Sequence, residues 1–212
     1  HHEGKAIFVD GALPGERVTY SVYKKKPSYA FAQLSSLERA SPSRTSPRCP
    51  HFGVCGGCRL QHMDASAQVA AKQRLLEDNL WHIGRVRADS LFAPIHGPSW
   101  GYRFRARLSV RYVEKKGGVL VGFHERKSSY VADMHQCEIL PPRIGHLIDP
   151  LRALISRLSQ PDRVPQIEVS LGDAVDVLLE LGAHILRPLA GEVFQAQLQR
   201  AVVGHVGDGS GD

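Results

Sequence analysis

Short alternating runs of apolar and polar residues occupy the start of the chain. Ala6–Val9 is an apolar run, and Arg17–Tyr23 and Tyr29–Leu37 each alternate apolar with polar side chains. This period of two is typical of strands that have one buried face. A turn at Gly11–Gly15 separates the first two runs, and a basic loop at Lys24–Lys26 separates the second from the third. Short strands broken by such turns predict a small OB-like β-barrel.

Two longer segments repeat their apolar residues at the spacing of an α-helix. In Ser66–Ile83 and in Arg143–Leu158, apolar side chains recur every three or four positions, as on the buried stripe of a helix. Gly84 directly follows the first segment and is a suitable helix stop. A linker rich in Ser and Pro, Ser41–Arg48, lies between the barrel and the first helical segment. We therefore expect one helix in each segment.

Further strand-like runs predict a mixed α/β central domain. Arg103–Val113 and Val119–His124 are joined by a turn at Lys115–Gly118. The other expected strands are Tyr130–Met134 and the hairpin of Gln166–Leu171 and Ala174–Leu181, turned at Gly172–Asp173. The expected fold class is α+β, with a barrel at 1–41, a cysteine-rich loop at 42–66, a central domain at 67–181 and a disordered tail at 182–212.

One expected strand carries a face of arginines. Alternate side chains of a strand point to the same side. The apolar side is expected to contain Phe104, Ala106, Leu108 and Val110, and the basic side Arg103, Arg105, Arg107, Ser109 and Arg111. Neighbouring guanidinium groups repel one another unless anions neutralise them. We expect RNA phosphates to do so, and acidic residues elsewhere in the fold are the alternative.

The positive charge is concentrated in two stretches. The net charge is +6, and residues 102–127 hold eight Lys or Arg against two Asp or Glu. The first 60 residues hold nine against four. This distribution favours a nucleic-acid partner. The expected RNA contacts are Lys24, Lys25, Lys26, Arg103, Arg105, Arg107, Arg126 and Lys127, with Phe123 either stacking on a base or belonging to the core.

No targeting or membrane segment is recognised. No apolar run approaches the ~20 residues of a membrane span, and the first residues lack the apolar core of a signal peptide. We therefore expect a cytoplasmic protein. In that reducing compartment, cysteines are more often metal ligands than disulfides.

The four cysteines are unevenly spaced. Cys49, Cys55 and Cys58 lie within ten residues of one another, and Cys137 follows after a gap of 78 residues. Four thiolates can hold Zn²⁺ or a [4Fe–4S] cluster. Zinc ribbons usually pair two C-x-x-C knuckles, whereas this chain has one, so the spacing favours the cluster and leaves zinc as the alternative. Because four cysteines complete a ligand set, we interpret three nearby histidines as loop residues: His51, His62 and His135.

These motifs resemble a known family. The run Glu3–Glu16 resembles the TRAM domain, an RNA-binding β-barrel. The run Arg48–His62 resembles the iron–sulfur loop of the RumA/RlmD class of 23S ribosomal-RNA uracil-5-methyltransferases, and the central domain of that class is matched by four short runs: Trp100–Arg103, Arg105–Ser109, Gly122–Phe123 and Gln136–Leu140. The resemblance implies a [4Fe–4S] cluster on Cys49, Cys55, Cys58 and Cys137, which helps to fold the protein and present RNA.

The resemblance also implies a reaction. In this class a cysteine thiolate adds to carbon 6 of uracil, and carbon 5 then takes the methyl group of S-adenosylmethionine. This chain has no Gly-rich cofactor loop after a strand and no fifth cysteine to act as nucleophile. We therefore expect a monomeric front half that binds 23S ribosomal RNA rather than DNA, lacks the first barrel strand and does not methylate alone. The alternative is a stand-alone RNA-binding module with a structural metal.

Overall fold

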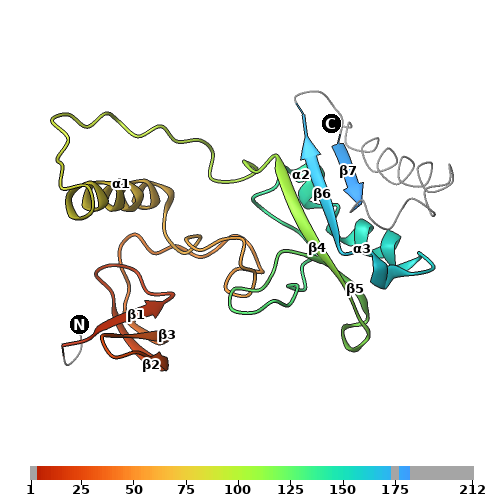
Figure 1. Ribbon diagram of the computed structural model, residues 1–212, viewed down its shortest axis with the longest axis horizontal. Helices are drawn as coiled ribbons and strands as arrows, with labels where there is room; N and C mark the ends of the chain where they lie inside the picture. The colour runs from red at the N-terminus through yellow and green to blue at the C-terminus, as the bar shows by residue number, and fades with distance from the viewer. Residues whose placement is uncertain (1–3, 173–176, 182–212) are drawn as a thin grey trace. The chain divides into compact units, whose positions relative to one another are not determined.

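The computed structural model describes residues 4–172 and 177–181, and they fall into two compact units (Figure 1). Unit 1 combines residues 4–48 with 60–96, and unit 2 combines 49–59 with the described residues from 97 onward. None of the helices in this part of the chain has the length and apolar character needed to cross a membrane. The expected tail at 182–212 and part of the turn after Gly172 lie outside the described residues.

The three strands expected in unit 1 are present and form one sheet. They are β1 (Ala6–Asp10), β2 (Arg17–Lys25) and β3 (Tyr29–Arg39), in the order β1-β3-β2. β1 runs parallel to β3, and β2 runs antiparallel to it. A barrel closes only when its outer strands pair with each other. Among the described residues β1 and β2 remain the two edges, so the sheet is open and the expected OB-like barrel is not seen.

A buried ion pair fixes the linker that follows this sheet. The Glu16 carboxylate, with 0% of its side chain exposed, accepts hydrogen bonds from Arg44 Nη2 at 2.7 Å and from the backbone N–H groups of Leu13 at 2.8 Å and Ser41 at 3.1 Å. Arg44 also donates to the carbonyl of Gly11 at 2.7 Å. Arg44 lowers the pKa of Glu16 from 4.5 to about 2. This pair ties the turn after β1 to residues 41–44.

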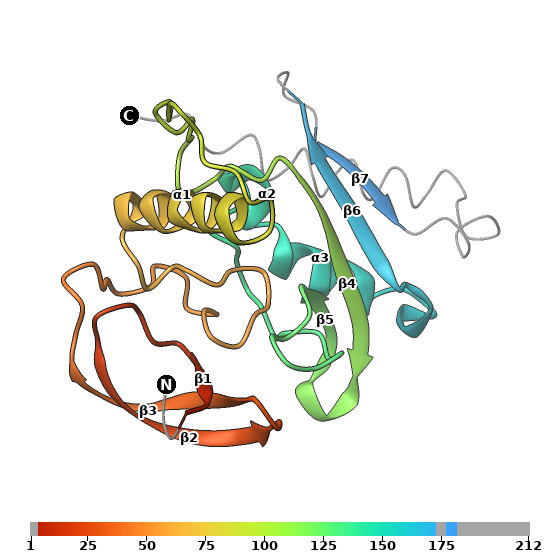
Figure 2. The same ribbon diagram turned by 60° about the vertical axis from the view of Figure 1, so that its left-hand side comes forward.

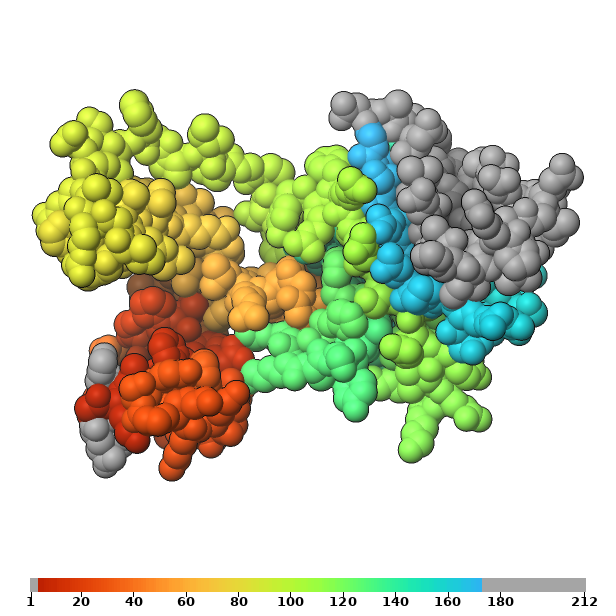
Figure 3. Space-filling view, viewed as in Figure 1, coloured from red at the N-terminus to blue at the C-terminus, as the bar shows by residue number. Residues whose placement is uncertain are grey.

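The first expected helix is confirmed within one residue at each end. α1 (Ala65–His82) begins after Asp64, whose carboxylate accepts a hydrogen bond from Ala67 N at 2.9 Å. It ends at Ile83, whose N–H donates to Asn79 O at 2.9 Å. No residue of α1 is buried. Residues 83–96 contain no helix or strand and are all exposed, and they form a thin extension after α1 (Figure 3).

Unit 2 is built on a four-stranded antiparallel sheet. Its strands are β4 (Arg105–Val113), β5 (Gly118–Gly122), β6 (Gln166–Leu171) and β7 (Val177–Leu181), in the order β5-β4-β6-β7. The helices are α2 (Pro142–Gly145) and α3 (Ile148–Ser156), with short 3-10 turns at Glu114–Lys116 and Pro161–Arg163 (Figure 2). One core joins sheet and helices, and its fully buried members include Leu108, Val121, Ile144, Ile148, Ile155 and Ile167.

Three expectations in unit 2 are wrong in detail. Phe104 is 52% exposed because β4 begins one residue later, at Arg105, so this side chain does not join the apolar face. Tyr130–Met134 forms no strand, and Val131 makes only an isolated bridge to His124. The single helix expected at Arg143–Leu158 is two, because the chain turns at Gly145 to accept a hydrogen bond from Cys137 N at 3.2 Å.

Candidate metal centre and nucleic-acid interface

The cysteine loop is shaped by its own backbone hydrogen bonds. The N–H of Phe52 donates to Cys49 O at 3.1 Å, and the N–H groups of Val54 and Cys55 both donate to His51 O, at 3.3 and 2.9 Å. These bonds wind the chain into consecutive turns between Cys49 and Cys55. The turns bring two cysteines that are six positions apart to the same side of unit 2, where both are buried.

The loop is pinned to the segment that follows β5. Gly56 N–H donates to His124 O at 2.8 Å, and Arg126 N–H donates to Val54 O at 2.9 Å. Cys55 and Glu125 form a backbone bridge between these bonds. A Cβ atom on Gly56 would lie 2.8 Å from the His124 oxygen, closer than real Cβ contacts allow. The glycine after Cys55 is therefore required by the close approach of two backbones.

Long-range contacts bring the remote cysteine to this loop. Cys137 is separated from Cys58 by 78 intervening residues. The chain just before it is held by His135 N–H, which donates to His51 Nε2 at 3.2 Å. The chain just after it is held by Arg103 N–H, which donates to Ile139 O at 2.9 Å. These bonds hold the chain on both sides of Cys137, and the first of them ties it directly to the cysteine loop.

The four thiols lie within electrostatic range of one another. Burial raises the pKa of the Cys137 thiol to about 11 and also raises the pKa values of Cys49 and Cys55. A charge on Cys58, which is half-buried, raises the pKa of each of these three further. All four are reduced thiols. Burial thus favours the protonated thiols, and a cation bound here would have to displace those protons.

Backbone N–H groups point at the sulfur atoms. Gly57 N–H donates to Cys55 Sγ at 3.3 Å. The N–H groups of Ile139 and Leu140 hydrogen-bond Cys137 and lower its pKa against the effect of burial. Amide bonds to sulfur stabilise thiolates and tune bound clusters. The donor set therefore suits a sulfur-ligated centre, although among the described residues no three His, Cys, Asp or Glu side chains have the arrangement of a metal-ion site.

The basic face of β4 is real but partly neutralised. Arg105 and Arg107 are exposed on one side of the strand. Ala106, Leu108 and Val110 on the other side are buried. Glu168 lies opposite Arg107 in the sheet register, and its Oε1 accepts a hydrogen bond from Arg107 Nε at 2.8 Å. Arg105 Nη2 lies 3.9 Å from the same carboxylate. An acidic residue of the fold, Glu168, therefore neutralises Arg107, as the alternative to RNA phosphates had it. The same carboxylate is the ion-pair partner of Arg105, so one negative charge faces two guanidinium groups.

The other expected RNA residues have different surroundings. The Arg103 guanidinium carbon lies 5.5 Å from the centre of the Phe123 ring, and that ring is half-buried against the core. Arg126 is half-buried and Lys127 is exposed. Both directly follow Glu125, which forms a backbone bridge with Cys55 of the cysteine loop. Lys24, Lys25 and Lys26 are exposed in unit 1, where the first two end β2 rather than forming a loop.

Sequence reasoning missed three residues around these sites. Tyr102 lies near the sulfurs, and burial together with Cys58 raises the pKa of its hydroxyl. Glu138 provides an N–H group that hydrogen-bonds Cys49. Glu168 is the acidic partner of β4. Tyr102 and Glu138 stand next to motif residues, which was a usable signal, whereas nothing local singles out Glu168.

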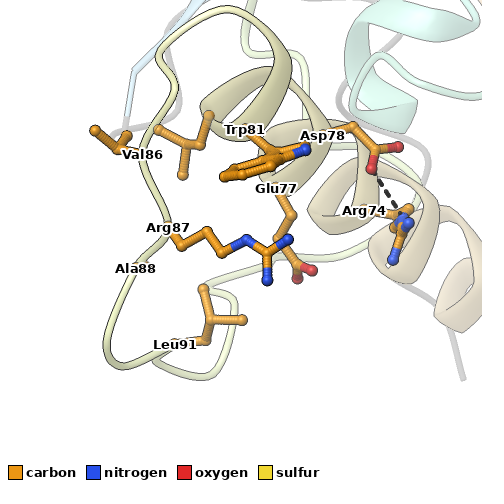
Figure 4. A pocket seen from close by; sticks show the side chains of 9 residues that line it. Arg74, Glu77, Asp78, Trp81, Val86, Arg87, Ala88 and Leu91 are labelled. Carbon is orange, nitrogen blue, oxygen red and sulfur yellow. Dashed lines mark ion pairs between the residues drawn. The ribbon is translucent and has the colours of Figure 1, made fainter.

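A separate pocket of about 350 Å³ lies in unit 1, between α1 and the segment after it (Figure 4). The guanidinium of Arg87 lies 4.2 Å from the Trp81 ring centre, and Arg74 pairs with Asp78 at 3.1 Å. Its remaining lining residues are Glu77, Leu80, Val86, Ala88 and Leu91. None of the cysteines or expected RNA contacts lines it.

Comparison with known proteins gives a consistent result. No family model matches the chain. Three similar proteins carry the name 23S rRNA (uracil(1939)-C(5))-methyltransferase RlmD. The Burkholderia thailandensis protein is 60% identical over 186 residues (88% of this chain, 39% of the relative), and the Burkholderia cenocepacia protein is 61% identical over the same shares. The Bordetella parapertussis protein is 60% identical over 179 residues, 84% of this chain and 38% of the relative. The chain thus spans about two-fifths of the length of these relatives. The resemblance predicted from the cysteine loop is thereby confirmed, and the matched part of this chain is a relative of the RlmD 23S rRNA uracil-C5-methyltransferases.

Proposed function

We propose that this chain is the RNA-binding, iron–sulfur-containing part of an S-adenosylmethionine-dependent 23S rRNA uracil-C5-methyltransferase. The observation that carries the proposal is the return of Cys137 to the loop of Cys49, Cys55 and Cys58, with backbone N–H groups directed at the sulfurs. The relatives' name supplies the reaction and the RNA. Since the chain spans 39% of their length, methyl transfer is proposed for the whole protein only.

We propose that the four cysteines hold one [4Fe–4S] cluster. Burial raises the pKa values of Cys49, Cys55 and Cys137, so ionising these thiols costs free energy. A bound cation would offset that cost. One C-x-x-C knuckle with two outlying cysteines suits a cluster better than zinc. Bound there, the cluster would cross-link the loop to the chain around Cys137, a structural role.

RNA would contact this chain mainly through its phosphates. Arg105 is the best candidate, because it is exposed and its carboxylate partner, Glu168, is 3.9 Å away and shared with Arg107. In unit 2 we also propose Arg103, Arg107, Arg126 and Lys127. In the TRAM-like unit 1 we propose Lys24 and Lys25 at the end of β2, and Lys26 directly after it. Phe123 supports this surface by carrying the Arg103 guanidinium. The cytoplasm, where ribosomal RNA is modified, is the proposed location.

The test compares RNA binding by two forms of the same chain. Anaerobically purified protein and protein stripped of metal are titrated with a labelled 23S rRNA fragment that contains the uridine region named for the relatives. We expect salt-dependent binding by the first form and weaker binding by the second, because the loop that the metal holds borders Arg103 and Arg126. Heparin, an unrelated polyanion, is the control ligand. If both forms bind heparin as well as they bind the RNA fragment, the RNA role is contradicted.

A further inference from the structure

Four aromatic side chains gather on one face of the unit 1 sheet. Phe8 on β1 lies opposite Phe31 on β3 in the parallel register, with their ring centres 5.7 Å apart. Tyr29 lies 5.4 Å from Phe31 and 5.8 Å from Phe8, edge-on to both. Tyr23 on β2 lies 6.4 Å from Phe31 with its ring plane tilted by only 21°. We call these four residues the aromatic platform.

The platform faces outward. Phe8 is 55% exposed and Tyr23 is 53% exposed. On the other face of β3, Ala30 and Ala32 are 4% and 0% exposed, so the small residues point inward. The alternation of β3 thus places alanines in the core and rings at the surface. Tyr29 and Phe31 are half-buried beside these two exposed rings. Exposed apolar clusters of this kind mark interaction surfaces.

A β-bulge brings positive charge to the same rings. Val22 pairs with Ala32, but Lys24 pairs with Phe31, so Tyr23 and Lys24 together oppose one residue of β3. Bulges re-aim side chains and are common beside functional sites. Lys25 and Lys26 follow and are exposed, like Lys24. Because Lys24 pairs with Phe31, it lies on the platform side of the sheet, whereas Lys25 pairs with Ala30 on the other side.

We propose that the platform binds unpaired bases of RNA, with Phe8 and Tyr23 stacking on the bases and Lys24 contacting an adjoining phosphate. Open ring faces beside a basic edge are the features that single-stranded nucleic acids require. A base-paired duplex offers no free base face. An apolar protein partner would carry no anionic groups to pair with the lysine side chain. The proposal rests on the proposed RNA role and adds to it the class of RNA and the side chains that read it.

The experiment measures binding of a single-stranded oligoribonucleotide containing 2-aminopurine. Phe8→Ala and Tyr23→Ala should each weaken binding about 5- to 100-fold and reduce the quenching of 2-aminopurine fluorescence, which reports stacking. Neither should change the dependence of affinity on salt. Lys24→Gln should instead reduce the log–log salt slope by about 0.7. Tyr23→Phe keeps the ring and should bind like the wild type.

The matched control is Phe92→Ala, which removes an equally large ring that is 91% exposed in the same unit but outside the platform. It should bind like the wild type, and all variants should keep the wild-type circular dichroism. If Phe8→Ala binds and quenches like the wild type while Arg105→Gln weakens binding, the platform proposal is wrong and the RNA role stands. If a duplex of the same sequence binds equally well, the platform proposal is also wrong. If the wild-type chain binds no RNA, both are wrong.

Discussion

The two units of this chain are stabilised in different ways. Unit 2 has one contiguous apolar core of Leu, Ile and Val side chains, and the cysteine loop is attached to it. Unit 1 buries only a few apolar residues, and α1 buries none. Its most enclosed interaction is the Glu16–Arg44 ion pair. A buried ion pair is easily damaged by loss of one partner, whereas an apolar core is damaged by changes of shape. The units should therefore respond to different perturbations.

The largest expected effect is loss of a cluster ligand. Cys137→Ser removes the proposed ligand that would join the loop to the sheet, and structural metal binding contributes on the order of 10 kcal/mol to folding of small metal domains. We expect amide hydrogen exchange in unit 2 to accelerate, most of all in residues 49–59 and 123–126, with unit 1 unchanged. Gln136→Ala is the control. Wild-type exchange in Cys137→Ser would show that the cysteine does not hold the loop.

Unit 1 should fail when its ion pair is broken. Glu16→Gln removes the charge that Arg44 faces, and removal of one partner of a buried pair costs about 3–5 kcal/mol. We expect faster amide hydrogen exchange in β1 and β2 and no change of exchange in unit 2. The exposed pair of Arg17 with Glu38, 3.9 Å apart, provides the control, since Glu38→Gln should change stability little.

The same carboxylate gives unit 1 an acid sensitivity. Because Arg44 lowers the Glu16 pKa from 4.5 to about 2, the folded state holds this proton less tightly than the unfolded state. The stabilisation is complete above pH 4.5 and is lost as the pH falls from about 4.5 towards 2. Protection factors in unit 1, which remove the intrinsic pH dependence of amide exchange, should fall across that range in the wild type and stay flat in Glu16→Gln. A flat wild-type profile would show that Glu16 is not ionised in the pair.

A smaller effect should follow from Gly145→Ala. A Cβ atom there would lie 2.5 Å from the backbone oxygen of Cys137, so either α2 or the cysteine must move. Overpacking of this kind costs about 1–3 kcal/mol. We expect a lower melting temperature and a faster loss of iron in air than in Gly172→Ala, where an added Cβ meets open space. Unchanged iron retention would mean that the α2 turn does not position Cys137.

The smallest expected effects concern the arginines of β4. Arg105→Gln should reduce the log–log salt slope of RNA binding by about 0.7–0.9. Arg107→Gln should reduce it less, because Glu168 already engages Arg107 at 2.6 Å. Glu168→Gln should strengthen RNA binding by freeing both. If Arg105→Gln leaves slope and affinity unchanged, Arg105 makes no phosphate contact.

The comparison also explains what the sequence could and could not predict. Alternation predicted β2, β3 and β4, and helical spacing predicted α1, because these patterns are set by residues close together in the sequence, although α1 buries none of its apolar residues. The sharing of one centre by the four cysteines stays a prediction from their spacing. By contrast, Glu168 meets Arg107 across 61 residues through strand register, which no local pattern encodes.

The break between α2 and α3 has the same kind of cause. The apolar spacing of residues 143–158 is helical throughout, but the contact of Gly145 with Cys137 overrides it. Phe104 follows the strand alternation in sequence, yet β4 starts after it. In each case a long-range backbone contact or an element boundary, and not the local pattern, decides the structure.

The most direct test of the cluster is elemental analysis of the anaerobically purified chain. The account predicts about four iron atoms and about four sulfide ions per chain, with no zinc. It also predicts that serine at any one of Cys49, Cys55, Cys58 or Cys137 lowers both, whereas Val54→Ala in the same loop, where Val54 is exposed, does not. One zinc per chain without sulfide, or full iron in Cys137→Ser, would contradict it.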